Sequence, residues 1–352
     1  MPMLRIKKEI FAKGKILVNY SVQEITFNDI PAIQLINKKN NSAAVIAIQG
    51  ATLIDLKINT DGNLIEVIDG YLNLQELKST TGSRSAIMAP FSNRLKDNRY
   101  IFQGEVYKLS ENPAPPKMHG FVKYENFTVT ASSADDSSAT VILLCSAIRE
   151  GKFPGYPFNV DVRVEYRLTE ESLSLSITGI NKGEKTAPYA AGWHPYFKMG
   201  NESVDTLSVL LNAESIILTD ENYVPLEGEK AYGKLDNTNP FYFGSDKSQR
   251  ERILSDKKVN FCYSGLLQNS NSISQALLMS DTLKTCLTIT NSGNVFYIFT
   301  ADGLAVRPRG SVAIEPVEFM TNGFNRPEYA GQLVLKPGAA KTFTAQVKWS
   351  QL

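Results

Sequence analysis

The sequence lacks several features typical of nucleic-acid-binding and disulfide-rich proteins. Lys and Arg number 37 against 36 Asp and Glu, a net charge of +1 in 352 residues. Charge this balanced gives no electrostatic reason to bind a polyanion, so nucleic acid is not an expected partner. The three cysteines, Cys145, Cys262 and Cys286, are an odd number at wide spacing. This is typical of reduced, buried thiols rather than of a disulfide framework or a zinc site.

Long apolar runs are missing as well. No run of about 18 apolar residues, the length that a membrane-spanning helix needs, occurs in the chain. The N-terminal stretch MPMLRIKKEIFAKGKILVNYS carries charges throughout and lacks the apolar core of a signal peptide. We therefore expect a cytoplasmic protein with no membrane partner, and its 43% hydrophobic residues suffice for a globular core.

Helical periodicity is nearly absent, and strand patterns replace it. The best helix candidate, residues 72–78, is about two turns long. Residues 160–168 alternate between apolar and polar side chains, and the alternation resumes over residues 173–178 after a polar turn. This predicts a hairpin of two half-buried antiparallel strands. Similar runs predict further strands near residues 14–29, 43–48, 99–109, 126–131, 139–148, 206–212, 285–290, 295–300 and 341–349.

Frequent turn signals separate these runs, among them Asp61-Gly62 and a hairpin turn at Gln103-Gly104. Many strands without intervening helices argue against βαβ units and predict an all-β protein built as a large antiparallel β-sandwich. Length alone would allow two domains. No change in composition marks a linker, however, and the polar segment 131–138 lies between strands that look like one hairpin. We expect a single domain over residues 1–352.

The chain has only two histidines, the side chain best suited to proton transfer near neutral pH. His194 lies in residues 192–197 (GWHPYF), before a proline that favours extended backbone and among aromatic residues able to line a sugar pocket. Either histidine, His119 or His194, could instead be structural. Glu315 interrupts an apolar, strand-like stretch, so burial could raise its pKa and make it a base, or it could pair with a nearby Arg.

Other polar residues have weaker local signals. Asn93 and Arg94 offer hydrogen-bond donors suited to sugar oxygens, although a lone Arg is normally a surface charge. Glu318 lies too close to Glu315 along one segment to form the facing carboxylate pair of a glycosidase, and we take it as structural. Motifs for phosphate-binding loops, dinucleotides, zinc proteases and serine hydrolases are absent from the sequence.

The order of four segments resembles the aldose 1-epimerase (galactose mutarotase) family. These segments are Asn93-Arg94, His119-Gly120, residues 192–197 and Glu315-Pro316. The likeness continues through residues 155–157, 181–183, 322–325 and 335–338, and it covers roughly residues 15–350. It implies a large antiparallel β-supersandwich with few short helices, which agrees with the strand-rich pattern.

The resemblance also implies roles for individual residues. His194 would be the general acid that protonates the sugar ring oxygen, and Glu315 the general base that deprotonates the C1 hydroxyl. The ring would open to an aldehyde and close as the other anomer, with no cofactor and no metal. Arg94 and His119 would hold the sugar, with Asn93 in the same segment. Asn260 stands where the family would carry an aspartate that accepts hydrogen bonds from sugar hydroxyls, so selectivity could differ.

The implied partner is a free monosaccharide such as galactose or glucose. A phosphosugar is disfavoured, because the sequence around Asn93 and Arg94 lacks the glycine-, proline- and tryptophan-rich stretch of the related hexose-6-phosphate epimerases. Two other classes stay open. A noncatalytic carbohydrate-binding protein could use the same scaffold, although His194 and Glu315 are retained. A glycoside hydrolase or lyase would need a second catalytic group that the sequence does not identify. Both a monomer and a homodimer are compatible with the sequence.

Overall fold

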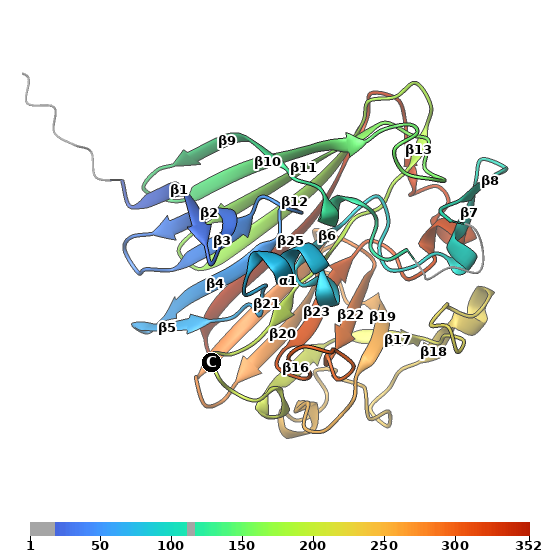
Figure 1. Ribbon diagram of the computed structural model, residues 1–352. Coiled ribbons are helices and arrows are strands. Elements are labelled where there is room, and N and C mark those ends of the chain that lie inside the picture. Colours follow the sequence, from blue (N-terminus) through green and yellow to red (C-terminus); the bar gives the residue numbers. More distant parts are fainter. Residues whose placement is uncertain (1–17, 111–116) are drawn as a thin grey trace, which may run out of the picture.

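The structure is a computed structural model that describes residues 18–110 and 117–352 (Figure 1). The sheet with the longest strands, called the long sheet below, has eight antiparallel strands in the order β16-β20-β21-β25-β12-β11-β10-β9. In that order the strands are Ser208–Leu211, Ser274–Ser280, Thr285–Asn291, Ala340–Gln351, Ser172–Asn181, Val160–Leu168, Ala139–Ile148 and Thr128–Ala134. The predicted hairpin is confirmed as β11 and β12, with Val164 opposite Ile177. Both side chains are buried, because they project from the face that meets the second layer.

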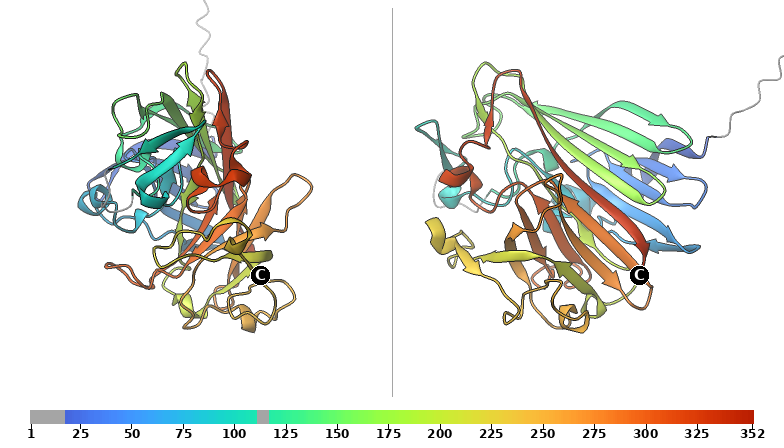
Figure 2. Two further views of the ribbon diagram at one scale, coloured as in Figure 1. Left: turned by 90° about the vertical axis from the view of Figure 1, so that its right-hand side faces the viewer. Right: turned by 180° about the vertical axis from the view of Figure 1, so that it is seen from behind.

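Two further sheets pack against this long sheet, which is seen from behind in Figure 2. The first, in the order β1-β2-β3-β4-β5, comprises Tyr20–Phe27, Ile30–Asn37, Ala43–Ala47, Leu53–Thr60 and Asn63–Glu66. Its strands β2 and β4 contact β10, β11 and β25. The second has the order β18-β17-β19-β22-β23-β14-β6, and β23 contacts β21. In that order its strands are Tyr232–Lys234, Ala213–Ile217, Asn260–Leu266, Val295–Phe299, Val312–Val317, Gly192–His194 and Ala86–Met88. An eighth strand, β15 (Tyr196–Phe197), also pairs with β23.

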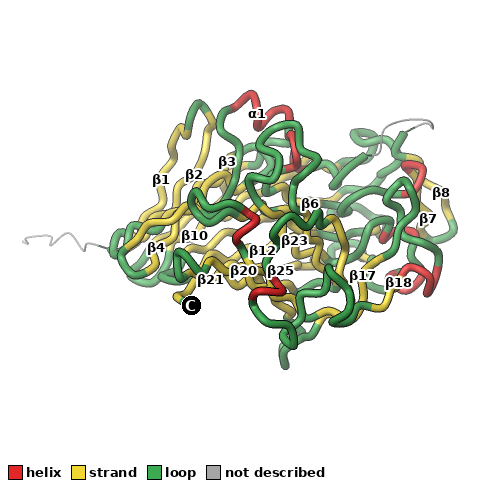
Figure 3. Tube along the Cα trace, turned by 90° about the horizontal axis from the view of Figure 1, so that it is seen from below, coloured by secondary structure: helices red, strands yellow, loops and turns green. Residues whose placement is uncertain are grey.

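Smaller elements complete the described chain. Strands β7, Arg99–Phe102, and β8, Glu105–Lys108, form one hairpin, and β13, Ala187–Pro188, pairs with β24, Val334–Leu335. Helix α1, Leu74–Ser79, is the only α-helix in the described residues (Figure 3). The other helical elements are 3-10 turns at Thr81–Ser83, Lys96–Asn98, Val122–Tyr124, Val204–Thr206, Gly228–Ala231, Arg250–Arg252, Gly323–Asn325 and Pro327–Tyr329.

The all-β antiparallel prediction is confirmed, but some predicted boundaries are wrong. The strand predicted near residues 206–212 is observed as β16, Ser208–Leu211, which is shorter because a 3-10 turn at Val204–Thr206 precedes it and the chain leaves it at Asn212 for β17 in another sheet. The strand predicted over residues 14–29 is observed as β1, and residues 14–17 lie outside the described residues. It ends early because Asn28 and Asp29 have φ of 44° and 65° and make a tight turn into β2.

Other sequence predictions are met. The turn at Gln103-Gly104 is confirmed, since both residues have positive φ as a two-residue hairpin turn requires. The cysteines are free and buried. No helix of the described chain combines the length and the apolarity that crossing a membrane requires. The single domain over residues 1–352 stays a prediction.

Candidate active site

The register of short strands in one sheet brings His194 and Glu315 together. Strands β14 and β23 pair with Gly192 opposite Val317, and β15 continues the same register with Tyr196 opposite Ala313. This register sets His194 opposite Glu315. Residues directly opposite one another project to the same face, and His194 Nε2 lies 3.3 Å from Glu315 Oε1. Two residues 121 positions apart in the chain thus become neighbours.

The same row of side chains continues across two more strands. Glu315 is opposite Tyr297 on β22, and Tyr297 is opposite Cys262 on β19. Asn260 precedes Cys262 by two residues and therefore faces the same side of the sheet. The hydroxyl of Tyr297 lies 2.7 Å from Thr321 Oγ1 and accepts a hydrogen bond from the Thr321 backbone N–H. This fixes the Tyr297 ring beside Glu315.

Loops supply the opposite side of the site. The backbone N–H of His119 donates to the Asn93 carbonyl at 2.8 Å, and Asn93 and His119 both adopt left-handed backbone, with φ of 53° and 60°. Nδ1 of His119 lies 3.3 Å from Asn93 N and 2.8 Å from Met88 Sδ. Because protein groups occupy Nδ1, Nε2 is the nitrogen of His119 that can face a ligand. The His119 and His194 rings meet edge to face with centroids 5.0 Å apart.

Two glycines of the recognised motifs permit this close packing. Gly120 has φ of +67°, and a Cβ there would lie 2.0 Å from the Ala89 carbonyl oxygen. Gly192 passes between neighbouring strands, where a Cβ would lie 2.9 Å from Met88 Cε and 3.0 Å from Val317 Cγ1. A larger residue at Gly120 would strain the turn that carries the adjacent His119, and one at Gly192 would crowd the strand that carries His194 two residues later.

Arg94 is held in place by a loop from elsewhere in the chain. Its Nη1 donates to the Asn222 carbonyl at 2.9 Å, and its guanidinium carbon lies 5.4 Å from the centre of the Tyr223 ring. The side chain of Asn93 accepts a hydrogen bond from the Arg94 backbone N–H at 3.0 Å. The guanidinium is therefore oriented by polar and cation–π contacts within the protein.

A cavity of about 470 Å³ adjoins these groups. Its lining includes Asn93, Arg94, Tyr223, Asn260, Cys262 and Tyr297. A volume of this size suits a small-molecule ligand. His119, His194 and Glu315 are not among the residues of its lining and are only 4%, 6% and 4% exposed. Glu315 lies opposite the lining residue Tyr297, His194 contacts Glu315, and His119 contacts the lining residue Asn93. The structure thus groups the six predicted site residues around one region, and their roles stay predictions.

Burial sets the protonation of the central pair. It raises the pKa of Glu315 to about 8 and lowers the pKa of His194 to about 3, since each charged form loses its hydration. Burial, followed by the charges of His194, Lys123 and Arg94, also lowers the pKa of His119. The coupled His194–Glu315 pair therefore holds one proton over a wide range of pH. Perturbation of this kind is common at functional sites.

Several neighbours of the pair escaped the sequence analysis. Tyr297 lies in the run VFYIF, which is apolar on both faces and carries no local signal. The Tyr223 contact with Arg94 joins two distant loops. Tyr196 is part of the segment GWHPYF, but its stacking on His194, with ring centroids 5.0 Å apart and planes at 21°, has no signal in the sequence. Glu318 has the contacts expected of a structural residue, because its carboxylate accepts from Ala191 N at 2.6 Å and pairs with Lys341 at 3.0 Å.

Within residues 18–110 and 117–352, no group of three or more His, Cys, Asp and Glu side chains is arranged to hold a metal ion.

Comparison with known proteins points to one family. Residues 31–348 match the family model for aldose 1-epimerase. Aldose 1-epimerase from Escherichia coli (strain K12) is 26% identical over 241 residues, 65% of this chain and 67% of that protein. Galactose mutarotase from Sus scrofa is 22% identical over 215 residues, 58% of this chain and 61% of that protein. The solved structure of galactose 1-epimerase from Lactobacillus acidophilus NCFM covers 95% of this chain and 99% of its own, with a TM-score of 0.77 at 18% identity, which shows a shared fold.

Proposed function

The chain belongs to the aldose 1-epimerase family, and from this premise we propose that it interconverts the α and β anomers of a free aldose such as galactose or glucose. One observation carries the proposal: His194 Nε2 and Glu315 Oε1 lie 3.3 Å apart, buried, beside a cavity of about 470 Å³. The ring oxygen and the C1 hydroxyl oxygen of an aldose are bonded to the same carbon. An acid and a base this close together can reach both oxygens at once.

The proposed reaction needs two coordinated proton transfers. Glu315 as carboxylate removes the proton from the C1 hydroxyl, while protonated His194 gives its Nε2 proton to the ring oxygen. The bond between C1 and the ring oxygen breaks, and C1 becomes an aldehyde. After rotation about the C1–C2 bond, the former ring hydroxyl attacks the other face of the carbonyl. His194 takes that proton back, and Glu315 returns its proton to the C1 oxygen.

The pair carries one proton throughout this cycle. Burial alone favours the form with the proton on Glu315 and His194 neutral, so the hydrogen bonds of the bound sugar would shift the proton to His194 before the ring opens. With the closed ring in this reactive form His194 is protonated and Glu315 is ionised; with the ring open both groups are neutral. A buried pair that holds a single proton suits this exchange, because neither state adds net charge to the site. The scheme uses proton transfers only, so it contains no cofactor or metal.

The other residues of the site would orient the sugar. Arg94, with its guanidinium held by Asn222 and Tyr223, would donate hydrogen bonds to sugar oxygens, as would Nε2 of His119. Asn93 and Asn260 line the same cavity and would contact further hydroxyls. Orientation matters because both proton transfers require distances of about 3 Å.

Polarimetry tests the proposal. Freshly dissolved α-D-galactose or α-D-glucose mutarotates slowly by itself, and the protein should accelerate the approach to the same final rotation. Xylose and arabinose extend the assay to other aldoses. Failure to accelerate any of these sugars would reject the proposal, and sugar binding without acceleration would favour the noncatalytic carbohydrate-binding alternative.

A further inference from the structure

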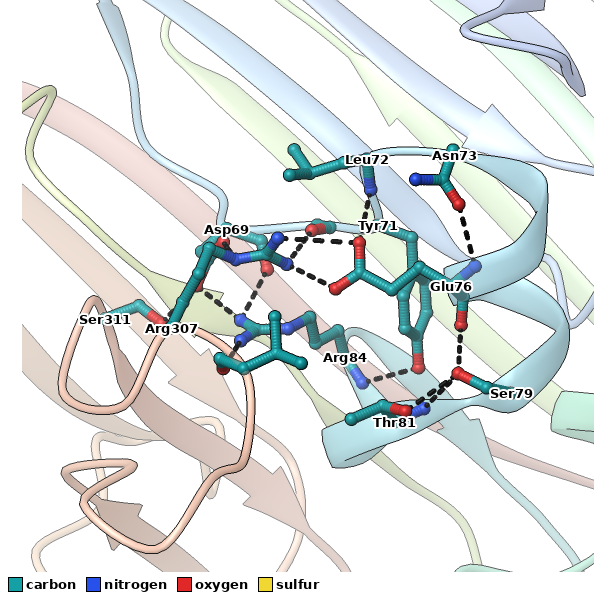
Figure 4. Close-up of polar contacts among 12 residues, drawn as sticks. Asp69, Tyr71, Leu72, Asn73, Glu76, Ser79, Thr81, Arg84, Arg307 and Ser311 are labelled. Carbon is teal, nitrogen blue, oxygen red and sulfur yellow. Dashed lines mark hydrogen bonds and ion pairs between the residues drawn. The ribbon is translucent and has the colours of Figure 1, made fainter.

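A buried ion pair lies close to the proposed acid. Arg84 is 1% exposed and Asp69 is 7% exposed, and Arg84 Nη1 contacts both the Asp69 carboxylate and, at 3.2 Å, the Asp69 carbonyl (Figure 4). The residue after Arg84, Ser85, donates its backbone N–H to the His194 carbonyl at 2.8 Å. Arg84 is therefore attached to the strand that carries His194.

The ring of Tyr196 connects Arg84 with His194. The Arg84 guanidinium carbon lies 5.0 Å from the centre of the Tyr196 ring, and that ring stacks on the His194 imidazole with centroids 5.0 Å apart. The Tyr196 hydroxyl donates to the Gly82 carbonyl at 3.0 Å. The ring is thus held at its hydroxyl by the backbone and at its face by a cation.

Asp69 joins the strands of both proposed catalytic groups. Its backbone N–H donates to the Tyr196 carbonyl at 2.9 Å, two residues after His194. Its carboxylate accepts from Ser311 Oγ at 2.7 Å, immediately before β23, and pairs with Arg307 Nε at 3.0 Å (Figure 4). One residue therefore links β15, through its backbone, with the start of the strand that bears Glu315, through its carboxylate.

We propose that Arg84, held by Asp69 and acting through Tyr196, is a positioning residue that fixes the His194 imidazole against Glu315. This inference rests on the proposed function. Neither Arg84 nor Asp69 is among the residues that line the cavity, so their effect on the reaction is indirect. A buried ion pair is expensive to desolvate and adds little stability over apolar packing, and a role in placing His194 gives this pair a reason to be in the core.

The Arg84 cation also affects the protonation of His194. After burial, the charges of Lys123 and Arg84 lower the pKa of His194. Glu315 and Asp69 are the nearby acids, and His119 and Tyr196 are the titratable rings packed on His194. Loss of the Arg84 cation should therefore make His194 easier to protonate, in addition to freeing its ring.

The decisive variant is Arg84→Met, with Arg326→Met as a matched control. Arg326 is also buried, pairs with Glu328 at 2.6 Å and lies over a tyrosine ring, that of Tyr232, at 5.8 Å. Arg84→Met should lower kcat about 10- to 100-fold, with KM changed less than about twofold. The acid limb of the pH profile of kcat/KM, which His194 sets, should move to higher pH. Arg84→Lys should restore both the wild-type kcat and the wild-type pH profile. Arg326→Met should leave kcat, KM and the pH profile of kcat/KM unchanged.

A second measurement does not depend on turnover. Only two imidazoles occur in the chain, so the ring protons of His194 can be assigned by NMR with a His119→Gln variant. At neutral pH, Arg84→Met should shift these signals and weaken their contacts with the Tyr196 ring, and Arg326→Met should not. A wild type that accelerates no mutarotation would reject the proposed function, and the NMR comparison would still decide this inference.

Unchanged His194 signals and unchanged kcat in folded Arg84→Met would overturn the inference. If that variant does not fold, Tyr196→Leu and Tyr196→Phe replace it. Phe keeps the ring that stacks on His194, and Leu removes it. We expect the His194 signals to move in Tyr196→Leu and to stay in place in Tyr196→Phe; the same signals in both variants would equally overturn the inference.

Discussion

His194 and Glu315 have few polar protein groups around them. The His194 Nδ1 atom is buried without a hydrogen-bond partner among the described residues. Burial is the sole cause of the raised pKa of Glu315. A carboxylate or an imidazolium left this poorly solvated is unstable, and under the proposed function the hydroxyls of a sugar would supply the missing hydrogen bonds.

His194→Gln and Glu315→Gln should each lower kcat by roughly 100- to 10,000-fold, the range in which proton transfer by a positioned group contributes. KM should change much less, because each variant keeps a polar side chain of similar reach. The double variant should be little slower than either single one, since both groups act in the same step. Polarimetry gives the rates, and a Glu315→Gln variant with wild-type kcat would remove Glu315 from the base role.

The pH dependence of kcat/KM should be bell-shaped. Below a pKa of about 3 for His194 both groups carry a proton, and above a pKa of about 8 for Glu315 neither does. Only the form with one proton on the pair is active, so activity should be level near pH 6 and fall above about pH 8. Initial rates of α-D-glucose mutarotation, corrected for the spontaneous rate at each pH, measure this; activity that keeps rising through pH 9 would contradict it.

Asn260→Asp should change the ranking of aldoses, mainly through KM. Asn260 is exposed at the start of β19 and lines the cavity. A carboxylate accepts charge-assisted hydrogen bonds from two hydroxyls, whereas the amide offers one acceptor and two donors. Sugars that differ at one hydroxyl should separate by about 1 to 3 kcal/mol at most.

Glucose, galactose, xylose and arabinose are the test substrates for this variant. Asn63→Asp is the control, because Asn63 is also exposed at the start of a strand but belongs to the five-stranded sheet. The control should keep the wild-type ranking. If Asn260→Asp keeps it too, Asn260 does not select the sugar.

At the scale of elements, hairpins could be predicted and long-range pairings could not. Strands β11 and β12 alternate and are joined by a local turn, so both periodicity and turn chemistry are visible in the sequence. Strand β23 is buried at all of its positions, and its partner β14 has three residues. Continuous apolar runs of this kind cannot be assigned a register by alternation. His194 and Glu315 were found through resemblance to a family, whereas their contact required the structure.

The turn that carries His119 should depend strictly on its glycine. Gly120→Ala places a Cβ 2.0 Å from the Ala89 carbonyl oxygen at a φ of +67°. Gly104→Ala, at a φ of +84° with nothing within 4 Å, suffers the backbone strain alone. We expect the free energy of unfolding to fall by about 1 kcal/mol for Gly104→Ala and by more than about 3 kcal/mol for Gly120→Ala. Urea titrations measure both values, and equal losses would show that the close approach at Gly120 relaxes freely.

At the scale of the whole molecule, the site depends on parts of the chain that lie far apart. Asp69 follows the five-stranded sheet, His194 and Glu315 lie in the second sheet, and the long sheet packs against both. One hydrophobic cluster includes Leu35, Val164 and Ile314, one from each of these sheets. Each sheet therefore buries its apolar face on another, and none has a separate core of comparable size.

We therefore expect one cooperative unfolding transition, as a single domain requires. If the five-stranded sheet unfolded first, it would expose the apolar face of β10 and β11 and release Asp69 from Tyr196 and Ser311. Calorimetry should give a calorimetric enthalpy equal to the van't Hoff enthalpy. A bound aldose should raise Tm without splitting the transition, because it stabilises only the folded state. Two separate transitions, with only one of them moved by the sugar, would show that the chain is divided into independent domains.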